Sequence, residues 1–332
     1  MKLYLTLATV VFLAMLLLPL TVIQNNSESK DSSKTSSAVS EEATSTSQKE
    51  STEKADGEAQ VISVMLNKSG EVVDVDMFEY IVGVLAAEMP VFYHEEALKA
   101  QAVASYTYAM HIKSTSASKE SDIVDDSCVH QGYLDIEAQK AKFGDNYETA
   151  RAKLEKAVKS VYGKQLVFDD MPAKTVYHAL NTGSTENCKN IWQSEISYLS
   201  GTSSDGDRLS PDFCTEVALT AQQFRETAEK LCKEEITSEE SEWIGEIKAT
   251  PAGTVTSIIL CGKTFSGSDI RTAYELKSAA FTLKYKDGMF IFKVYGNGHM
   301  VGMSQYGADY MARQGSNYKE ILMHYYHGTQ LV

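Results

Sequence analysis

The first 60 residues divide into two segments that cannot contribute to a globular core, so the fold must be built from the rest. Residues 3–23 are predominantly apolar, and Lys2 is the only charge before them. This run is long enough to cross a hydrocarbon layer of about 30 Å. We interpret residues 1–24 as a membrane signal anchor. A cleaved secretion signal is the alternative, although no A-x-A cleavage site follows Pro19.

Residues 25–60 are rich in Ser, Thr, Glu and Lys and contain almost no apolar side chains. Such a composition buries too little surface to offset its ordering entropy, which predicts a disordered tether. The folded region is therefore expected to span residues 61–332.

The whole chain carries a formal net charge of −14. An acidic surface repels both nucleic acid and anionic lipid headgroups. We therefore expect no nucleic acid partner.

The periodicity of the folded region predicts an α+β protein. Two alternating stretches, 61–66 and 71–75, predict strands around a turn, and a helix is expected immediately afterwards. Asp76 followed by Glu79 predicts a capping box at the start of that helix, and Pro90 predicts its end. A second helix over 95–111 carries small residues on one face, including Ala102 and Ser105, which allow close packing.

Further elements are expected along the rest of the chain. Helices are predicted near 148–161 and 221–233, strands at 165–170 and 173–180, and a meander of strands at 242–250, 255–262, 281–288 and 289–296. Residues 216–285 could form a strand-rich subdomain. Lys286, Asp287 and Gly288 are typical of a hairpin turn. Asn317 with Glu320 predicts a capping box for a last helix that stops at Gly328.

Glu88 continues the apolar stripe of the first helix, four residues after Val84 and three after Leu85. Its carboxyl should therefore face the protein body or a cleft, at the negative end of the helix dipole. Both desolvation and this dipole raise the pKa of a carboxyl, as a general acid requires. A structural carboxylate bonded to the backbone near Tyr93 is the alternative.

Several blocks resemble one known family. The run GVLAAEMPVFYHEEALKAQAVASYTYA is similar to the signature of the stage II sporulation protein D family (SpoIID), which includes the amidase enhancers called LytB. Later blocks follow in the expected order: VHQGY, VYHALNTGSTEN, FSGSDIRTAYELKSAAF, YGNGHMVGMSQYGADYMA and YKEILMHYYHGTQL. The resemblance covers nearly all of the chain from Val61 onward.

The resemblance implies a peptidoglycan lytic transglycosylase that acts during engulfment of the forespore. Glu88, which precedes Met-Pro, would protonate the bond between N-acetylmuramic acid and N-acetylglucosamine, and would then take the proton of the muramoyl 6-hydroxyl as a 1,6-anhydro ring closes. The substrate would be glycan strands free of stem peptides, bound in a groove. No cofactor is required by this chemistry.

The same resemblance implies a location and partners. The chain would be a single-pass protein of the mother-cell membrane, with its C-terminal region outside the cytoplasm. Its partners would be a SpoIIP-like cell-wall amidase and a SpoIIM-like membrane scaffold.

The chain departs from the family pattern at three places. Tyr106 stands where an arginine is common, and tyrosine cannot replace its charge. The usual His-Ser-Thr reads His178-Ala179-Leu180, and the usual Gly-His-Gly-Val-Gly reads Gly298-His299-Met300-Val301-Gly302. These changes keep a second hypothesis open, in which the protein binds peptidoglycan and activates an amidase without cutting glycan.

Other candidate substrate-binding residues come from the same blocks. Hydroxyl, amide, imidazole and cationic side chains suit glycan hydroxyls and anionic sugars. The set comprises Lys99, Tyr106, His178, Arg271, His299, Ser304 and Gln305. A third hypothesis, hydrolysis with a second carboxylate, would use Glu186 or Asp205 and leave reducing ends.

Five widely spaced cysteines give no disulfide framework. Buried, inert thiols are the simplest interpretation. A structural zinc held by Cys128, His130 and Cys188 is an alternative, although no C-x₂-C pair is present. A disulfide between Cys188 and Cys214 is a further alternative if this region lies outside the cytoplasm.

Overall fold

The computed structural model describes residues 60–115, 121–127 and 129–332. The described residues form one compact unit, and all of the architecture below belongs to it. Within the described residues, no helix is both long and apolar enough to cross a bilayer. The predicted anchor and nearly all of the predicted tether lie outside the described residues.

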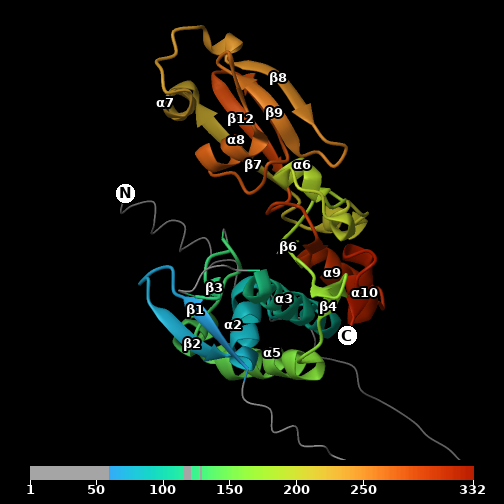
Figure 1. The fold of residues 1–332 in the computed structure, drawn as a ribbon. Coiled ribbons are helices and arrows are strands. Elements are labelled where there is room, and N and C mark those ends of the chain that lie inside the picture. Colours follow the sequence, from blue (N-terminus) through green and yellow to red (C-terminus); the bar gives the residue numbers. More distant parts are fainter. Residues whose placement is uncertain (1–59, 116–120, 128) are drawn as a thin grey trace, which may run out of the picture. The chain divides into compact units, whose positions relative to one another are not determined.

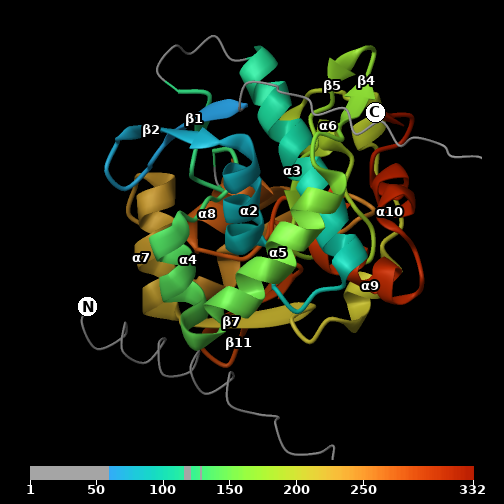
Figure 2. The same cartoon turned by 90° about the horizontal axis from the view of Figure 1, so that it is seen from below.

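Two hydrophobic cores organise the unit, and we call them the helical core and the strand core. The helical core packs together helices from both ends of the unit (Figures 1 and 2). These helices are α2 (Met77–Glu88), α3 (Glu95–Thr115), α5 (Tyr147–Val161), α9 (Gln305–Arg313) and α10 (Tyr318–Tyr325). The long helix α3 contacts all four of the others. Its small buried residues, among them Ala102, Ser105 and Ala109, allow this close approach.

Short strands and helices surround the helical core. A sheet in the order β2-β1-β3 comes first, a sheet β14-β4-β5 joins the C-terminus to the middle of the chain, and β6 pairs with β13 in parallel. The strands are β1 (Val61–Met65), β2 (Val72–Asp76), β3 (Ile123–Val124), β4 (Leu166–Phe168), β5 (Met171–Pro172), β6 (Tyr177–His178), β13 (Met303–Ser304) and β14 (Gln330–Leu331). Helices α4 (Ile136–Phe143) and α6 (Cys188–Trp192) complete this part.

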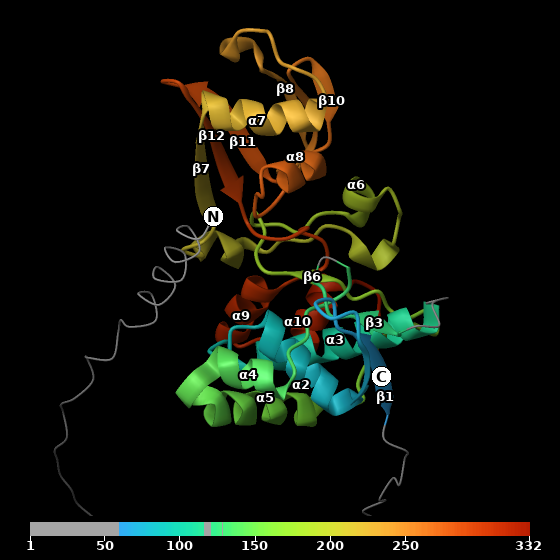
Figure 3. The same ribbon diagram turned by 90° about the vertical axis from the view of Figure 1, so that its left-hand side faces the viewer.

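The strand core is built from two three-stranded antiparallel sheets. One has the order β10-β9-β8 and the other β11-β12-β7. The strands are β7 (Cys214–Thr220), β8 (Ile244–Ala249), β9 (Val255–Leu260), β10 (Lys263–Phe265), β11 (Phe281–Lys286) and β12 (Met289–Tyr295). Helix α7 (Ala221–Cys232) contacts β7 and β12 (Figure 3). Helix α8 (Gly267–Ala273) contacts β9.

Stacked aromatic rings fill the strand core. The rings of Phe224 and Phe290 lie 3.9 Å apart, and the ring of Trp243 lies 5.3 Å from that of Phe290. All three side chains are buried. Phe224 comes from α7, so this stack fixes the helix onto the sheet that contains β12.

The predicted single meander is wrong, because these strands divide between the two sheets. Strand β7, which the sequence did not predict, pairs along the whole length of β12. The predicted hairpin turn is confirmed: Lys286 pairs with Met289, and both Asp287 (φ 51°) and Gly288 (φ 76°) have the left-handed conformation of a type I′ turn.

One of the two predicted capping boxes is formed. Asn317 accepts from the backbone of Glu320, whose side chain accepts in return from the backbone N–H of Asn317. At the start of α2, Asp76 caps the helix as predicted, but the side chain of Glu79 does not close the box. It instead accepts two hydrogen bonds from Arg151 of α5, at 2.9 and 2.8 Å.

The described cysteines are free thiols, so the alternative disulfide between Cys188 and Cys214 is wrong. Cys188 is buried in the helical core, whereas Cys214 is exposed at the start of β7.

Candidate active site

A pocket of about 840 Å³ opens beside the end of α2. Its lining comes from both cores, which contribute α2 and α3 on one side and α8 on the other. The residues that argue for function are Glu88, Tyr108, His130, Lys174, Tyr177, His178, Trp192, Arg271, Glu275, Gly298, His299 and Gln305. The pocket therefore brings together five sequence-predicted site residues that are up to 217 positions apart, as in Glu88 and Gln305.

Glu88 is the last residue of α2 and is half-buried in the pocket wall. Its Oε1 accepts a hydrogen bond from the backbone N–H of Gly132 at 2.6 Å. Within the described residues its Oε2 has no hydrogen-bond partner. Burial raises the pKa of Glu88, and the Gly132 bond and the charge of Lys142 oppose that rise. Glu88 thus holds its proton to a higher pH than an ordinary carboxyl does, and its second oxygen stays available to a ligand.

Gly132 has a specific reason to be glycine. A Cβ at this position would lie 2.9 Å from Oε1 of Glu88 and 3.3 Å from the Cβ of Ala87. Only a residue without a side chain lets its N–H approach the carboxyl this closely. The VHQGY block therefore fixes the orientation of the acid.

The residue before it, Gln131, connects two tyrosines near Glu88. Its Nε2 donates to the hydroxyl of Tyr80 at 2.9 Å, and its Oε1 accepts from the hydroxyl of Tyr177 at 2.9 Å. Gln131 is 1% exposed, so this chain of hydrogen bonds is a fixed part of the wall. Tyr177 belongs to the pocket lining and its hydroxyl is held by the amide.

His178 and His299 lie together, with ring centroids 5.8 Å apart. Nδ1 of His178 bonds the carbonyl of Val301 at 3.1 Å, and Nδ1 of His299 accepts from the N–H of Val301 at 3.1 Å. Burial is the main cause that lowers the pKa of His178 to about 3 and that of His299 to about 4. Both imidazoles are therefore neutral at physiological pH.

Gly298 allows the two histidine-bearing segments to meet. Its φ is +114°, and a Cβ there would lie 2.7 Å from the Cβ of His178. A side chain would strain the backbone and separate the segments. The glycines of the GNGHMVG block thus serve close packing around the pocket.

Cationic and aromatic side chains complete the wall. The ammonium of Lys174 lies over the ring of Trp192, 5.1 Å from its centroid, and that ring lies 5.3 Å from His299. Arg271, from α8, is close enough to His299 to contribute to the lowering of its pKa. Lys174 and Arg271 are the cationic residues of the described lining, which also contains the carboxyl groups of Glu88 and Glu275.

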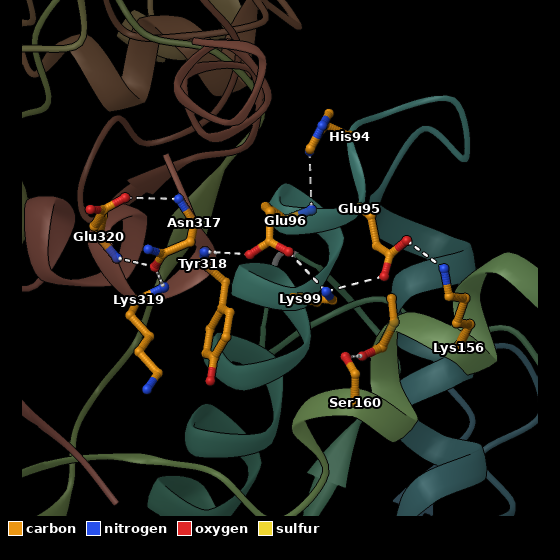
Figure 4. Close-up of polar contacts among 11 residues, drawn as sticks. His94, Glu95, Glu96, Lys99, Lys156, Ser160, Asn317, Tyr318, Lys319 and Glu320 are labelled. Atoms are coloured by element: carbon orange, nitrogen blue, oxygen red, sulfur yellow. Dashed lines mark hydrogen bonds and ion pairs between the residues drawn. The ribbon is translucent and has the colours of Figure 1, made fainter. Parts of the chain in front are cut away.

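Lys99 lies outside the pocket lining. Its ammonium pairs with Glu95 at 3.1 Å and Glu96 at 2.8 Å, on the first turn of α3 (Figure 4). Glu96 also accepts from the backbone N–H of Tyr318, the first residue of α10. Lys99 is therefore paired within α3, where it contacts the carboxylate that joins α3 to α10, and its geometry does not support a substrate contact.

Tyr106 and Ser304 also lie outside the pocket lining. The hydroxyl of Tyr106 donates to Gln60 at 2.9 Å, and its ring packs against Tyr162. Ser304 is buried, donates to Asp207 at 2.6 Å and caps α9 through the N–H of Gly307. Both side chains are engaged in structural contacts. A side chain at position 106 therefore does not supply a charge to the pocket.

Gln305, by contrast, lines the pocket. Its Nε2 donates to Oε1 of Gln101 at 3.4 Å, and Gln101 in turn donates to Ser105 at 3.0 Å. This buried chain of amides connects α9 to α3.

Two of the three zinc candidates can be placed. His130 lines the pocket, and its Nδ1 accepts from the backbone N–H of Val124 at 2.9 Å. The thiol of Cys188 donates to the carbonyl of Ser194 at 3.2 Å and is not in the pocket lining. Cys128 lies outside the described residues. Among the residues that the structure describes, no group of three potential ligands comes together.

The two carboxylates suggested for a hydrolase are engaged elsewhere. Glu186 is 3% exposed and accepts from Asn190 at 2.7 Å and Thr250 at 2.6 Å. Asp205 accepts from Ser203 at 2.9 Å. Neither belongs to the pocket lining, whereas Glu275, at an exposed position, does.

Sequence reasoning missed Lys174, Trp192, Glu275 and Tyr108. Lys174 lies in a loop and Trp192 ends the five-residue helix α6, so neither segment has a periodicity long enough to indicate which way a side chain faces. Tyr108 and Glu275 did lie in blocks singled out by the sequence, so their place in those blocks was the available signal.

Comparison with known proteins gives a consistent picture. The family model described as "Stage II sporulation protein" matches residues 66–168. The stage II sporulation protein D of Bacillus subtilis is 34% identical over 274 residues, which cover 81% of this chain and 78% of that protein. Its counterpart in Bacillus amyloliquefaciens is 33% identical over the same coverage. The amidase enhancer of Bacillus subtilis is 28% identical over 75% of this chain and 40% of its own length.

Proposed function

Because the chain belongs to the stage II sporulation protein D family, a family involved in sporulation, we propose that it is a peptidoglycan lytic transglycosylase with Glu88 as its catalytic acid and base. The observation that carries the proposal is the state of Glu88. It is a half-buried carboxyl in a large pocket, with its pKa raised by burial, one oxygen fixed by Gly132 and the other available.

The chemistry needs only this one carboxyl. Protonated Glu88 gives its proton to the oxygen between N-acetylmuramic acid and N-acetylglucosamine, and the bond from that oxygen to the muramoyl C1 breaks. The muramoyl 6-hydroxyl forms a new bond to C1, and its proton passes to the Glu88 carboxylate. The products are a 1,6-anhydro end and a free N-acetylglucosamine end, and Glu88 is protonated again.

The lining of the pocket suits this substrate. Neutral histidines and tyrosine hydroxyls offer hydrogen bonds to sugar hydroxyl and acetamido groups. Lys174 and Arg271 supply positive charge for the lactyl carboxylate of muramic acid, which is free only when the stem peptide has been removed. Trp192 is 37% exposed and presents an aromatic surface on which a sugar ring can pack.

The test is product analysis with the full-length protein and glycan strands freed of stem peptides. We expect mass spectrometry to detect 1,6-anhydro-muramoyl ends, and we expect Glu88→Gln to lose cleavage by at least about a hundredfold while it still binds strands. Cleavage that persists in Glu88→Gln would remove the assignment.

Glu275→Gln separates this mechanism from hydrolysis with two carboxylates. Hydrolysis needs a second carboxylate beside the scissile bond and yields reducing ends, and Glu275 is a second carboxylate of the described lining. We expect Glu275→Gln to keep producing anhydro ends. Reducing ends in the wild type, lost in Glu275→Gln, would establish hydrolysis instead.

The second candidate function is a non-catalytic activator of a cell-wall amidase. It is favoured by the similarity to the amidase enhancer of Bacillus subtilis. Strand binding without any anhydro product, together with stimulation of an amidase, would support it over catalysis.

The location and partners follow from the same proposal. Residues 1–24 would anchor the chain in the mother-cell membrane, with residues 61–332 outside the cytoplasm. A SpoIIP-like amidase would prepare the strands, and a SpoIIM-like scaffold would hold both enzymes. Protease protection of the C-terminal region in intact cells tests the orientation, and co-purification tests the partners.

A further inference from the structure

Lys142 approaches the end of the helix that carries Glu88. It lies on α4, which packs against α2 (Figure 2). Its Nζ donates to the carbonyl of Ala86 at 2.7 Å and to that of Ala87 at 3.1 Å. These are the two residues immediately before Glu88.

These contacts place a positive charge at the negative end of α2. The last four carbonyls of a helix have no partner within it and carry the negative end of its dipole. The described contacts of Lys142 satisfy two of those carbonyls. A cation here also favours the ionised form of a neighbouring carboxyl, which is the opposite of what burial does.

We propose that Lys142 is a positioning residue for the acid: its ammonium caps the C-terminus of α2 and sets the proton affinity of Glu88 through the charge that it places beside it. The proposal rests on the assigned role of Glu88. The opposing effects are already visible, because burial raises the pKa of Glu88 while Lys142 and the Gly132 N–H lower it.

The other groups near Glu88 do not supply a comparable charge. The charge of Glu88 acts on Tyr80 of the same helix and on Tyr177 of β6. Burial raises the pKa values of both tyrosines above their ordinary value of 10.0, so both side chains stay uncharged. His130 lines the same pocket, and burial lowers its pKa. Lys142 is the cation that contributes to the pKa of Glu88 among the described residues.

The proposed reaction needs both the effect that raises the pKa of Glu88 and the effect that lowers it. An acid that also serves as base must give up its proton in one step and regain it in the next, so a pKa far above the working pH impedes the first transfer. Without Lys142, burial and the helix dipole would raise the pKa of Glu88 further.

The experiment compares Lys142→Met, Lys142→Arg and the matched control Lys140→Met in the full-length protein. Lys140 lies on the same helix, is exposed and pairs with Glu137 at 2.8 Å. We expect Lys142→Met to move the alkaline limb of the pH profile of kcat/KM, measured on strands freed of stem peptides, to higher pH. Lys142→Arg should restore the wild-type limb, and Lys140→Met should leave it in place.

A readout without catalysis keeps this inference separate from the proposed function. The side-chain carboxyl ¹³C signal of Glu88, assigned by its loss in Glu88→Gln, can be titrated in each variant. We expect its midpoint to rise in Lys142→Met and not in Lys140→Met. An unchanged midpoint in folded Lys142→Met overturns the inference even if cleavage is observed, and a raised midpoint supports it even if no variant cleaves glycan.

Discussion

The carboxyl of Glu88 should make the stability of the protein depend on pH in a recognisable direction. Burial raises its pKa above the ordinary value of 4.5, so the fold binds this proton more tightly than the unfolded chain does. The contribution of Glu88 is therefore complete below about pH 4.5 and is lost as the pH rises through the raised folded value.

Glu88→Gln removes this dependence because the amide does not ionise. We expect the variant to be more stable than the wild type at pH 8, with the difference disappearing toward pH 4. Urea unfolding of both proteins at pH 8, 6 and 4 measures it. Equal stability of the two proteins at every pH would mean that Glu88 is not held in a desolvated site.

Gly132 offers a test of how finely the acid is positioned. In Gly132→Ala the new Cβ would meet Oε1 of Glu88 at 2.9 Å, so the carboxyl must move. A displacement of a catalytic group by about 1 Å can reduce the rate by about a hundredfold, and we expect a loss of cleavage of tenfold or more. Initial rates on strands freed of stem peptides provide the measurement.

The control for this substitution is Gly315→Ala. Gly315 has a φ of +101°, a Cβ at this position would meet no described atom within 4 Å, and the residue is not in the pocket lining. The variant should lose stability through backbone strain, by about 1 kcal/mol, without a comparable loss of rate. Equal rate losses in the two variants would indicate a general effect of destabilisation.

At the scale of helices and strands, the helices were predictable because their signals are local. The stripe of Tyr80, Val84 and Leu85, with Asp76 before it, predicts α2 within one residue of its observed end. The strand core was predicted less well. Most residues of the strand core lie between β7 and β12 in the sequence, so no local pattern indicates that these two strands pair.

The candidate site was also predictable only where the signal in the sequence is local or lies in a family motif. Glu88 was indicated by helix position alone, and the family resemblance pointed to His178, Arg271 and His299, which line the pocket. Ser304 comes from the same block as His299, yet its side chain points to Asp207. Between His299 and Ser304 the chain passes from a loop into the short strand β13, so no single periodicity relates the two side chains, and only the folded chain determines which of them reaches the pocket.

Helix α10 carries a prediction of its own. Asn317 accepts hydrogen bonds from the N–H groups of Lys319 and Glu320 at 3.0 and 3.2 Å (Figure 4). Removal of such a cap costs about 1 kcal/mol. We expect Asn317→Ala to lower the free energy of unfolding by that amount, measured by urea denaturation, and to leave cleavage unaffected. Ser316→Ala, one residue earlier, is the control, and an equal loss in it would argue against a capping effect.

At the scale of the whole molecule, the two neutral histidines predict that the free energy of unfolding falls at acidic pH. The pKa values of His178 and His299 are lowered to about 3 and about 4, so the unfolded chain binds protons at these sites before the fold does. Stability should therefore fall as the pH drops below about 6.5, by up to about 1.4 kcal/mol per pH unit for each histidine.

Urea unfolding between pH 7 and pH 5 tests this expectation, since carboxyl groups with ordinary pKa values remain largely ionised there. His178→Phe should show a shallower dependence on pH than the wild type. An identical slope in the two proteins would mean that His178 becomes protonated within the fold.

The chain enters and leaves the strand core at adjoining positions. Cys214, at the start of β7, pairs with Tyr295, at the end of β12, and the N–H of Gly296 donates to the carbonyl of Phe213 at 3.0 Å. The intervening 80-odd residues, by the chain numbering, are thus an insertion with adjoining ends, and α8 within it supplies Arg271 to the pocket. Evolution can therefore lengthen, shorten or exchange this module without displacing Glu88, Gly132 or Lys142, which all lie outside it.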